Sequence, residues 1–162
     1  MQRTLNQTGL TTSCLLLCIG LLGGCMTQAT GDFFSPAKHL GPDQTMVYLY
    51  FPRQPGLYTR PPTTILANGT TITRLDEGGY YPLRTAPGRM TFSLSGEPEN
   101  QNLTITAEPG HTYFVKVLIR YHETPRYYQL FLVNEELAMG EMGPLQLMTT
   151  CDTTQGCAQS LK

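Results

Sequence analysis

The sequence predicts an all-β domain: an antiparallel β-sandwich of about seven to eight strands with one short C-terminal helix. Two observations predict this class. The chain of 162 residues has 16 glycines, 12 prolines and no tryptophan, and only 14% of its residues are charged, a composition that favours short strands joined by tight turns. Between residues 45 and 133, period-two alternation and short apolar runs are separated by turn signals. A chain of this length supports one compact core.

The first element in chain order is a targeting segment. Arg3 precedes an apolar stretch (residues 10–22) that ends in Gly23, Gly24 and Cys25. This order of charge, apolar region and small residues is typical of an export signal. A permanent transmembrane span needs about 20 consecutive apolar residues, and residues 11–13 interrupt this run. We therefore expect residues 1–24 to be a cleaved signal peptide.

The string Leu22-Gly23-Gly24-Cys25 resembles the lipobox of bacterial lipoproteins. The resemblance implies cleavage before Cys25, a thioether bond from its thiol to a diacylglyceryl group, and a further palmitate-type chain on its amine. Two or more acyl chains anchor a protein stably, at roughly 0.8 kcal/mol per buried CH₂. The alternative is an ordinary secreted protein with a spare thiol. Because Met26 stands where an aspartate resembles an inner-membrane retention signal, we expect the outer membrane, facing the periplasm, with inner membrane or cell surface left open.

Residues 25–44 have scattered glycine and proline and no sustained periodicity, which is typical of a linker. We expect a lipidated tether with a root-mean-square span of about 25 Å if it is a random coil. Phe33 and Phe34 argue against complete freedom. We expect them to dock on the domain rather than at the lipid interface.

The folded domain is expected at residues 45–148. Its first strand, Thr45–Phe51, is almost continuously apolar and should be covered on both faces. A proline-rich loop covers residues 52–62. Asn68-Gly69 then predicts a hairpin within residues 63–75, because both central positions of a type I′ turn need positive φ.

Five further strands are expected between hairpin-type turns, at residues 80–85, 89–95, 102–107, 111–120 and 127–133. Asp76-Glu77-Gly78-Gly79, Pro87-Gly88 and Pro109-Gly110 supply turns between them. Asn134 is placed to cap a helix that extends through Met142, and Gly143-Pro144 should end it.

Three segments together carry a family resemblance: MVYLYF, ILANGTTITRLDEGGYYPLRTAPGRMTFSL and LTITAEPGHTYFVKV. They resemble a family of uncharacterised bacterial lipoproteins defined only as a domain of unknown function. The hairpin, Gly-Tyr strand and Pro-Gly turn also look like the transthyretin-like or carboxypeptidase-regulatory-like β-sandwich. The resemblance covers residues 45–133 and implies an envelope location. It carries no catalytic residues over to this chain.

The tail, residues 149–162, contains Cys151 and Cys157, for which a disulfide is the expected state in an oxidising compartment. Closing so short a loop stabilises by roughly 2 kcal/mol in the chain-entropy model, enough to order the tail but not to hold the core.

For the other side chains that could carry chemistry, a structural role explains the sequence better than a functional one. His122-Glu123 begins like a zinc helix motif, but Arg126 occupies the fifth position and Pro125 breaks a helix. His39 and His111 show no ligand spacing. The methionines of the C-terminal part are better explained by packing than by copper(I) binding: Met139, Met142 and Met148. The tyrosines are explained mainly by strand propensity, with a contact surface as the alternative.

The expected function is that of a membrane-anchored envelope lipoprotein with a non-catalytic binding or structural module and no cofactor or metal. A net charge of -1 gives no basic field for nucleic acid, so the expected partners are the membrane and an envelope protein or glycan. The alternative is a periplasmic carrier that binds a small ligand or a metal. An enzyme is not expected, because no G-x-S-x-G elbow or paired catalytic motif is present.

Overall fold

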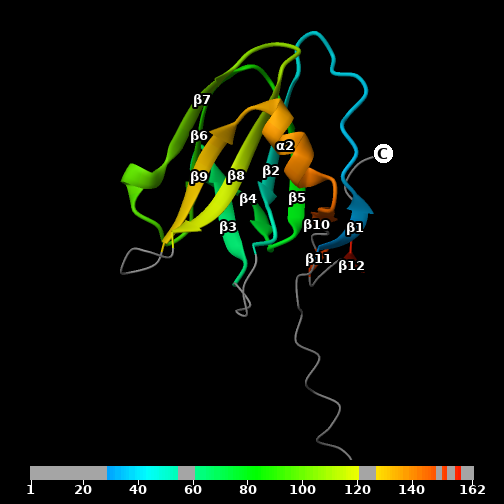
Figure 1. The fold of residues 1–162 in the computed structure, drawn as a ribbon. Helices are drawn as coiled ribbons and strands as arrows, with labels where there is room; N and C mark the ends of the chain where they lie inside the picture. Colours follow the sequence, from blue (N-terminus) through cyan, green and yellow to red (C-terminus); the bar gives the residue numbers. More distant parts are fainter. Residues whose placement is uncertain (1–28, 55–60, 121–126, 149–150, 153–155, 158–162) are drawn as a thin grey trace, which may run out of the picture.

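The computed structural model describes residues 29–54, 61–120, 127–148, 151–152 and 156–157 (Figure 1). These residues form two main sheets, a two-stranded pair and one short α-helix, so the expectation of a mostly β domain is confirmed. The six-stranded sheet contains, in spatial order, β1 (Ala29–Phe33), β10 (Gln146–Met148), β5 (Gly79–Thr85), β2 (Thr45–Phe51), β8 (Thr112–Arg120) and β9 (Tyr127–Val133). The four-stranded sheet contains β4 (Thr70–Leu75), β3 (Thr63–Ala67), β6 (Gly88–Leu94) and β7 (Leu103–Ala107). β11 (Cys151–Asp152) and β12 (Gly156–Cys157) form the pair.

Strand β2 lies inside the six-stranded sheet, between β5 and β8, and every one of its residues is buried, as its apolar sequence predicts. Successive side chains of a strand point to opposite faces. Val47, Leu49 and Phe51 therefore pack into one cluster, and Tyr48 and Tyr50 into another.

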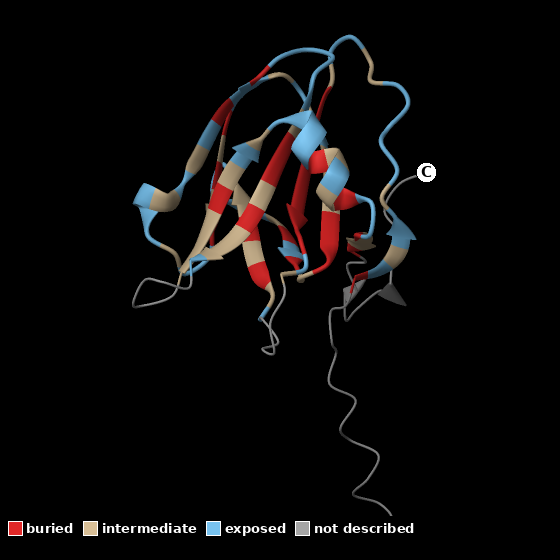
Figure 2. Ribbon diagram, viewed as in Figure 1, coloured by how far each residue is buried: buried red, intermediate tan, exposed pale blue. Residues whose placement is uncertain are grey.

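The first cluster, here called the inter-sheet core, lies between the two main sheets. β6 contributes Met90, Phe92 and Leu94, and β8 contributes Val115 and Val117. In each strand these are alternate residues, as expected when one face of a strand packs on the core. Figure 2 shows that the buried residues lie mainly on the strands of the two main sheets and that exposed residues dominate the connecting loops.

The second cluster, here called the outer core, lies on the other face of the six-stranded sheet. It joins Tyr48, Tyr80 and Phe114 to Ala138 and Met142 of α2 (Glu135–Met142), which covers this face (Figure 1). The helix begins as predicted: the side chain of its N-cap, Asn134, accepts a hydrogen bond from the backbone N–H of Leu137 at 2.9 Å.

The expectation of a purely antiparallel architecture is wrong. β2 pairs with β8 in parallel, and β10 pairs with β5 in parallel. Between β2 and β8 the chain forms all four strands of the four-stranded sheet and, partway, β5 of the six-stranded sheet. It then returns as β8, running in the same direction as β2. A parallel neighbour requires such a crossover connection.

The turn signals lie where they are expected, but only some of them join hydrogen-bonded strands. Asn68 (φ 49°) and Gly69 (φ 80°) form the predicted hairpin between β3 and β4. In contrast, the turns at Gly78, Pro87 and Gly110 carry the chain from one main sheet to the other. A turn signal predicts reversal of the chain and does not identify the sheet of the next strand.

The chain contains four short strands that its periodicity does not predict: β1, β10, β11 and β12. A segment of two to five residues is too short for alternation to be recognised. β1 lies within the expected tether and pairs with β10, so residues 29–33 belong to the sheet. The expected docking is confirmed for Phe34, which packs on the outer core, whereas Phe33 is exposed.

Candidate functional site

The outward face of the four-stranded sheet is rich in hydroxyl groups. Alternation along β6 buries Phe92 and Leu94 while Thr91 and Ser93 point outward. The same alternation leaves Thr104 and Thr106 exposed on the neighbouring strand β7. No α-helix packs on this face among the described residues, since α2 covers the other sheet.

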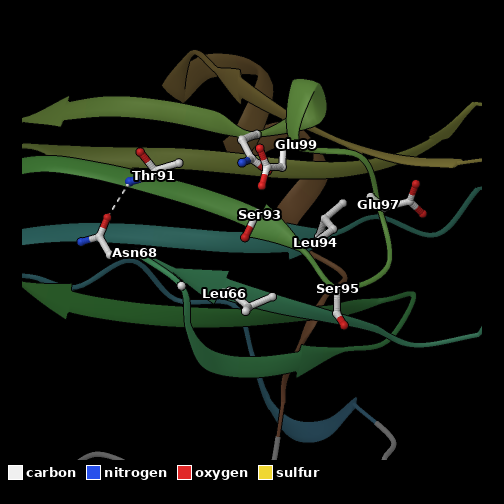
Figure 3. Close-up of a pocket in the computed structure, with 10 residues that line it drawn as sticks. Leu66, Asn68, Thr91, Ser93, Leu94, Ser95, Glu97 and Glu99 are labelled. Atoms are coloured by element: carbon white, nitrogen blue, oxygen red, sulfur yellow. Dashed lines mark hydrogen bonds between the residues drawn. The ribbon is translucent and has the colours of Figure 1, made fainter.

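An open hollow of about 530 Å³ lies on this face and on the loop that follows β6 (Figure 3). Leu66 and Leu94 supply its apolar part. Hydroxyl and amide groups supply most of the remaining lining: Asn68, Thr91, Ser93, Ser95 and Asn102. A concave surface with a few convergent polar groups is the usual form of a small-ligand site.

Hydrogen bonds from the backbone and from side chains hold this lining in place. The N–H of Asn68 donates to the carbonyl of Thr91 at 2.8 Å, and the N–H of Thr91 donates to Oδ1 of Asn68 at 2.9 Å. The N–H of Ser95 donates to the carbonyl of Thr64 at 2.9 Å. The Oγ1 atoms of Thr91 and Thr104 are 2.9 Å apart. The polar groups are therefore presented by hydrogen-bonded strands and turns.

Two carboxylates line one side of the hollow. Oε1 of Glu97 accepts a hydrogen bond from the backbone N–H of Tyr128 at 3.1 Å, which ties the loop to β9. Glu99 begins the 3₁₀ helix η2 (Glu99–Gln101) and is exposed. The lining contains no lysine or arginine. The charge of the hollow therefore favours neutral or cationic polar ligands over phosphates and nucleic acid.

A second polar cluster lies beneath α2. Nζ of Lys116 is 2.5 Å from Oε1 of Glu141, and the hydroxyl of Tyr50 donates to Oε2 of the same carboxylate at 2.7 Å. Burial, together with this hydrogen bond, raises the pKa of the Tyr50 hydroxyl. The ammonium and the hydroxyl group each have the Glu141 carboxylate as a partner. The arrangement therefore links the helix to the sheet, and the three groups are engaged with one another.

Cys25 and the lipobox residues Leu22, Gly23 and Gly24 lie outside the described residues. Within the described ranges, no helix has the length and apolar character of a membrane span. The backbone places Cys151 directly opposite Cys157 in the antiparallel pair β11–β12. His122 and Glu123 also lie outside the described residues.

The methionines considered as copper ligands are not brought together. Met139 and Met142 pack in the outer core, while Met148 packs in the inter-sheet core on the opposite face of the sheet. His111 is exposed in its turn, and its Nε2 is 3.8 Å from Glu108. Among the described residues, no group of three or more His, Cys, Asp and Glu side chains is arranged to hold a metal ion.

The tyrosines of the described strands are mainly packing residues. Tyr48, Tyr50 and Tyr80 are buried in the outer core, and Tyr113 and Tyr128 pack against the inter-sheet core. Burial raises the pKa of Tyr80, and Tyr48 and Asp32 contribute in the same direction. Strand propensity and packing therefore explain these tyrosines, and the contact-surface alternative finds no support in them.

No pattern in the sequence predicts the hollow. Its only signal was the presence of threonine and serine at the outward positions of β6 and β7, which is also the ordinary pattern of a solvent-facing strand. The hollow is lined by the Asn68 turn, by β6 and by the loop at Glu97, and it forms only when the fold brings these segments together. No protein-family model matches the sequence, and no similar curated protein or solved structure was found.

Proposed function

We propose that this chain is an envelope lipoprotein, acylated on Cys25, anchored in the outer membrane and facing the periplasm, whose β domain is a non-catalytic glycan-binding module. The observation that carries the binding function is the hydroxyl-rich hollow on the four-stranded sheet. The anchor is supported by the lipobox resemblance alone. We also infer a β-sandwich similar to the transthyretin-like domain, an assignment supported by the core that the two main sheets share.

The chemistry of the hollow supports a glycan over a protein partner. Protein interfaces depend on aromatic, methionine and arginine side chains at their centres, and none of these residue types lines the hollow. Its lining offers hydroxyl, amide and carboxylate groups, which complement the many hydroxyls of a sugar. Small apolar areas such as Leu66 suit the C–H face of a sugar ring.

The interior offers less support for the carrier alternative. The space between the main sheets is filled by buried side chains, including Ile65, Phe92 and Val115, each of them 0% exposed. A ligand there would have to displace close-packed core residues, which is costly. The open hollow requires no such displacement.

The test is binding of the full-length acylated protein, in detergent micelles, to purified peptidoglycan by sedimentation and to N-acetylhexosamine oligomers by calorimetry. Ser93→Arg fills the hollow and is expected to weaken binding at least about tenfold, equivalent to about 1.4 kcal/mol. Thr106→Arg places the same side chain on the same face, outside the lining, and is expected to change affinity less than about twofold. Equal losses in both variants, or no binding by the native protein, would refute the proposal.

We further propose a disulfide between Cys151 and Cys157. Directly opposed residues of an antiparallel pair have Cα atoms about 4.5–5.5 Å apart, which is within the range that a disulfide spans. Alkylation of the unreduced protein should leave both thiols unmodified. If mass spectrometry shows that both cysteines have been alkylated, the disulfide is not present.

A further inference from the structure

Phe33 has the highest exposure of the large apolar side chains in the described part of the chain, at 64%. It lies on β1, an edge strand of the six-stranded sheet. Its neighbour Phe34 packs its ring against Tyr48 and Tyr80, with centroid distances of 5.1 and 5.3 Å. Because Phe34 is held in this way, Phe33 stays outside the outer core, at the surface of the domain.

The strand that carries Phe33 pairs with β10, with a register shift between Ala29 and Phe33. Ala29 is buried and lies opposite Met148, and Phe33 lies opposite Gln146. Gly31 is so close to Leu147 that an added Cβ would lie 2.7 Å from the Cβ of Leu147. The described sheet therefore reaches Ala29, four positions after Cys25.

Four peptide steps span at most about 14 Å when fully extended. Acyl chains on Cys25 would hold that residue at the level of the lipid headgroups. Ala29 would then lie within about 14 Å of the membrane surface, whereas a flexible tether of residues 25–44 would allow about 25 Å. The domain is thus too closely tied to stand clear of the bilayer.

We propose that the β1 edge of the six-stranded sheet rests on the membrane and that Phe33 inserts its ring into the interfacial region of the lipid. This inference rests on the proposed acylation of Cys25. Phe33 follows Ala29 by four positions on the same strand, so the ring reaches the lipid when β1 lies along the surface. β9, the opposite edge of the sheet, then faces away from the membrane.

The experiment uses the absence of tryptophan from the chain. Phe33→Trp and Leu132→Trp each introduce a single fluorophore at an exposed apolar position, on β1 and β9 respectively; Leu132 is 49% exposed. Each acylated full-length variant is reconstituted into phosphatidylcholine–phosphatidylglycerol vesicles with and without brominated acyl chains. Bromine quenches only a tryptophan that reaches the lipid.

The expected result is strong quenching and a blue-shifted emission for the tryptophan at position 33, at least about twofold greater than any quenching at position 132. Equal quenching at both positions, or none at position 33, overturns the inference. Mass spectrometry of the Cys25 peptide separates the two failures. An acylated Cys25 with an unquenched tryptophan at position 33 refutes the docked orientation alone, whereas an unmodified Cys25 refutes the anchor and the orientation together.

Discussion

The carboxyl group of Asp76 lies between β4 and β5, where the chain passes from one main sheet to the other. Its Oδ2 is buried and has no hydrogen-bond partner. Burial raises the pKa of Asp76 above its ordinary value of 3.8, and the nearby Arg74 guanidinium opposes part of this effect. An ionised carboxylate in this position therefore costs stability.

Replacing this carboxyl by an amide should stabilise the fold at neutral pH. Because the pKa of Asp76 is higher in the folded chain, the folded state binds the proton more tightly, and stability falls as the pH rises from 3.8 through the raised pKa. Asp76→Asn should therefore have a higher Tm than the native protein at pH 7. Well below pH 3.8 the Asp76 carboxyl is protonated in both the folded and the unfolded chain, so the difference in Tm between the variant and the native protein should shrink toward zero. A lower Tm for the variant at pH 7 would contradict this account.

At this scale the turn chemistry could be predicted from the sequence. Asn68 and Gly69 adopt positive φ as an Asn-Gly pair predicts, because few other residues tolerate that region. The unpartnered oxygen of Asp76 could not be predicted. It depends on which groups the second sheet brings to the turn, and no local pattern encodes this.

Among the elements, α2 depends on its polar link to the sheet. Only Ala138 and Met142 of the helix are buried, so apolar packing alone holds it weakly. Glu141 binds both Lys116 of β8 and Tyr50 of β2, and its side chain is 25% exposed while that of Lys116 is 13% exposed. Removing Glu141 would leave a mostly buried ammonium group and a buried hydroxyl without their partner.

Glu141→Ala is expected to lower the free energy of unfolding by roughly 2–4 kcal/mol, because an unpaired buried charge is costly. Glu136→Ala is the matched control: Glu136 is an exposed residue of the first turn, and its loss should cost less than about 1 kcal/mol. Urea unfolding followed by circular dichroism measures both. Similar losses in the two variants would show that the link does not stabilise the helix.

The helix itself was predictable and its docking was not. Asn134 and Gly143-Pro144 mark its ends in the sequence, because capping is a local interaction. Lys116 and Glu141 are separated by 25 positions in the chain. Their pairing requires β8 to lie beneath α2, which in turn requires the parallel neighbour β2.

In the molecule as a whole, the described part of residues 25–44 belongs to the fold: residues 29–33 form β1, and the residues after it pack on the outer core. Leu40 packs on the outer core together with Phe34, and the backbone N–H of Ala37 donates to the hydroxyl of Tyr48 at 2.8 Å. Phe34 and Leu40 thus pack on the same face of the six-stranded sheet as α2. The domain therefore includes residues N-terminal to Thr45.

Phe34→Ala should destabilise the domain by roughly 2–3 kcal/mol, because it removes apolar contacts and two edge-to-face ring pairs. Phe33→Ala, at the adjacent and exposed position, should change the free energy of unfolding by less than about 0.5 kcal/mol. Thermal unfolding of the two variants in detergent, without vesicles, makes the comparison. A negligible effect of Phe34→Ala would mean that this segment is a tether after all.

Local patterns in the sequence predict the class of the domain, the ends of its helix, the buried strand β2 and the turn at Asn68, since each follows from local backbone preference or from alternation along one strand. Tertiary structure alone decided that β8 lies parallel to β2, that residues 29–33 form an edge strand, and that the polar hollow opens over β6. These features arise where segments distant in the chain meet. Their stability comes from contacts across sheets, which a pattern within one segment does not contain.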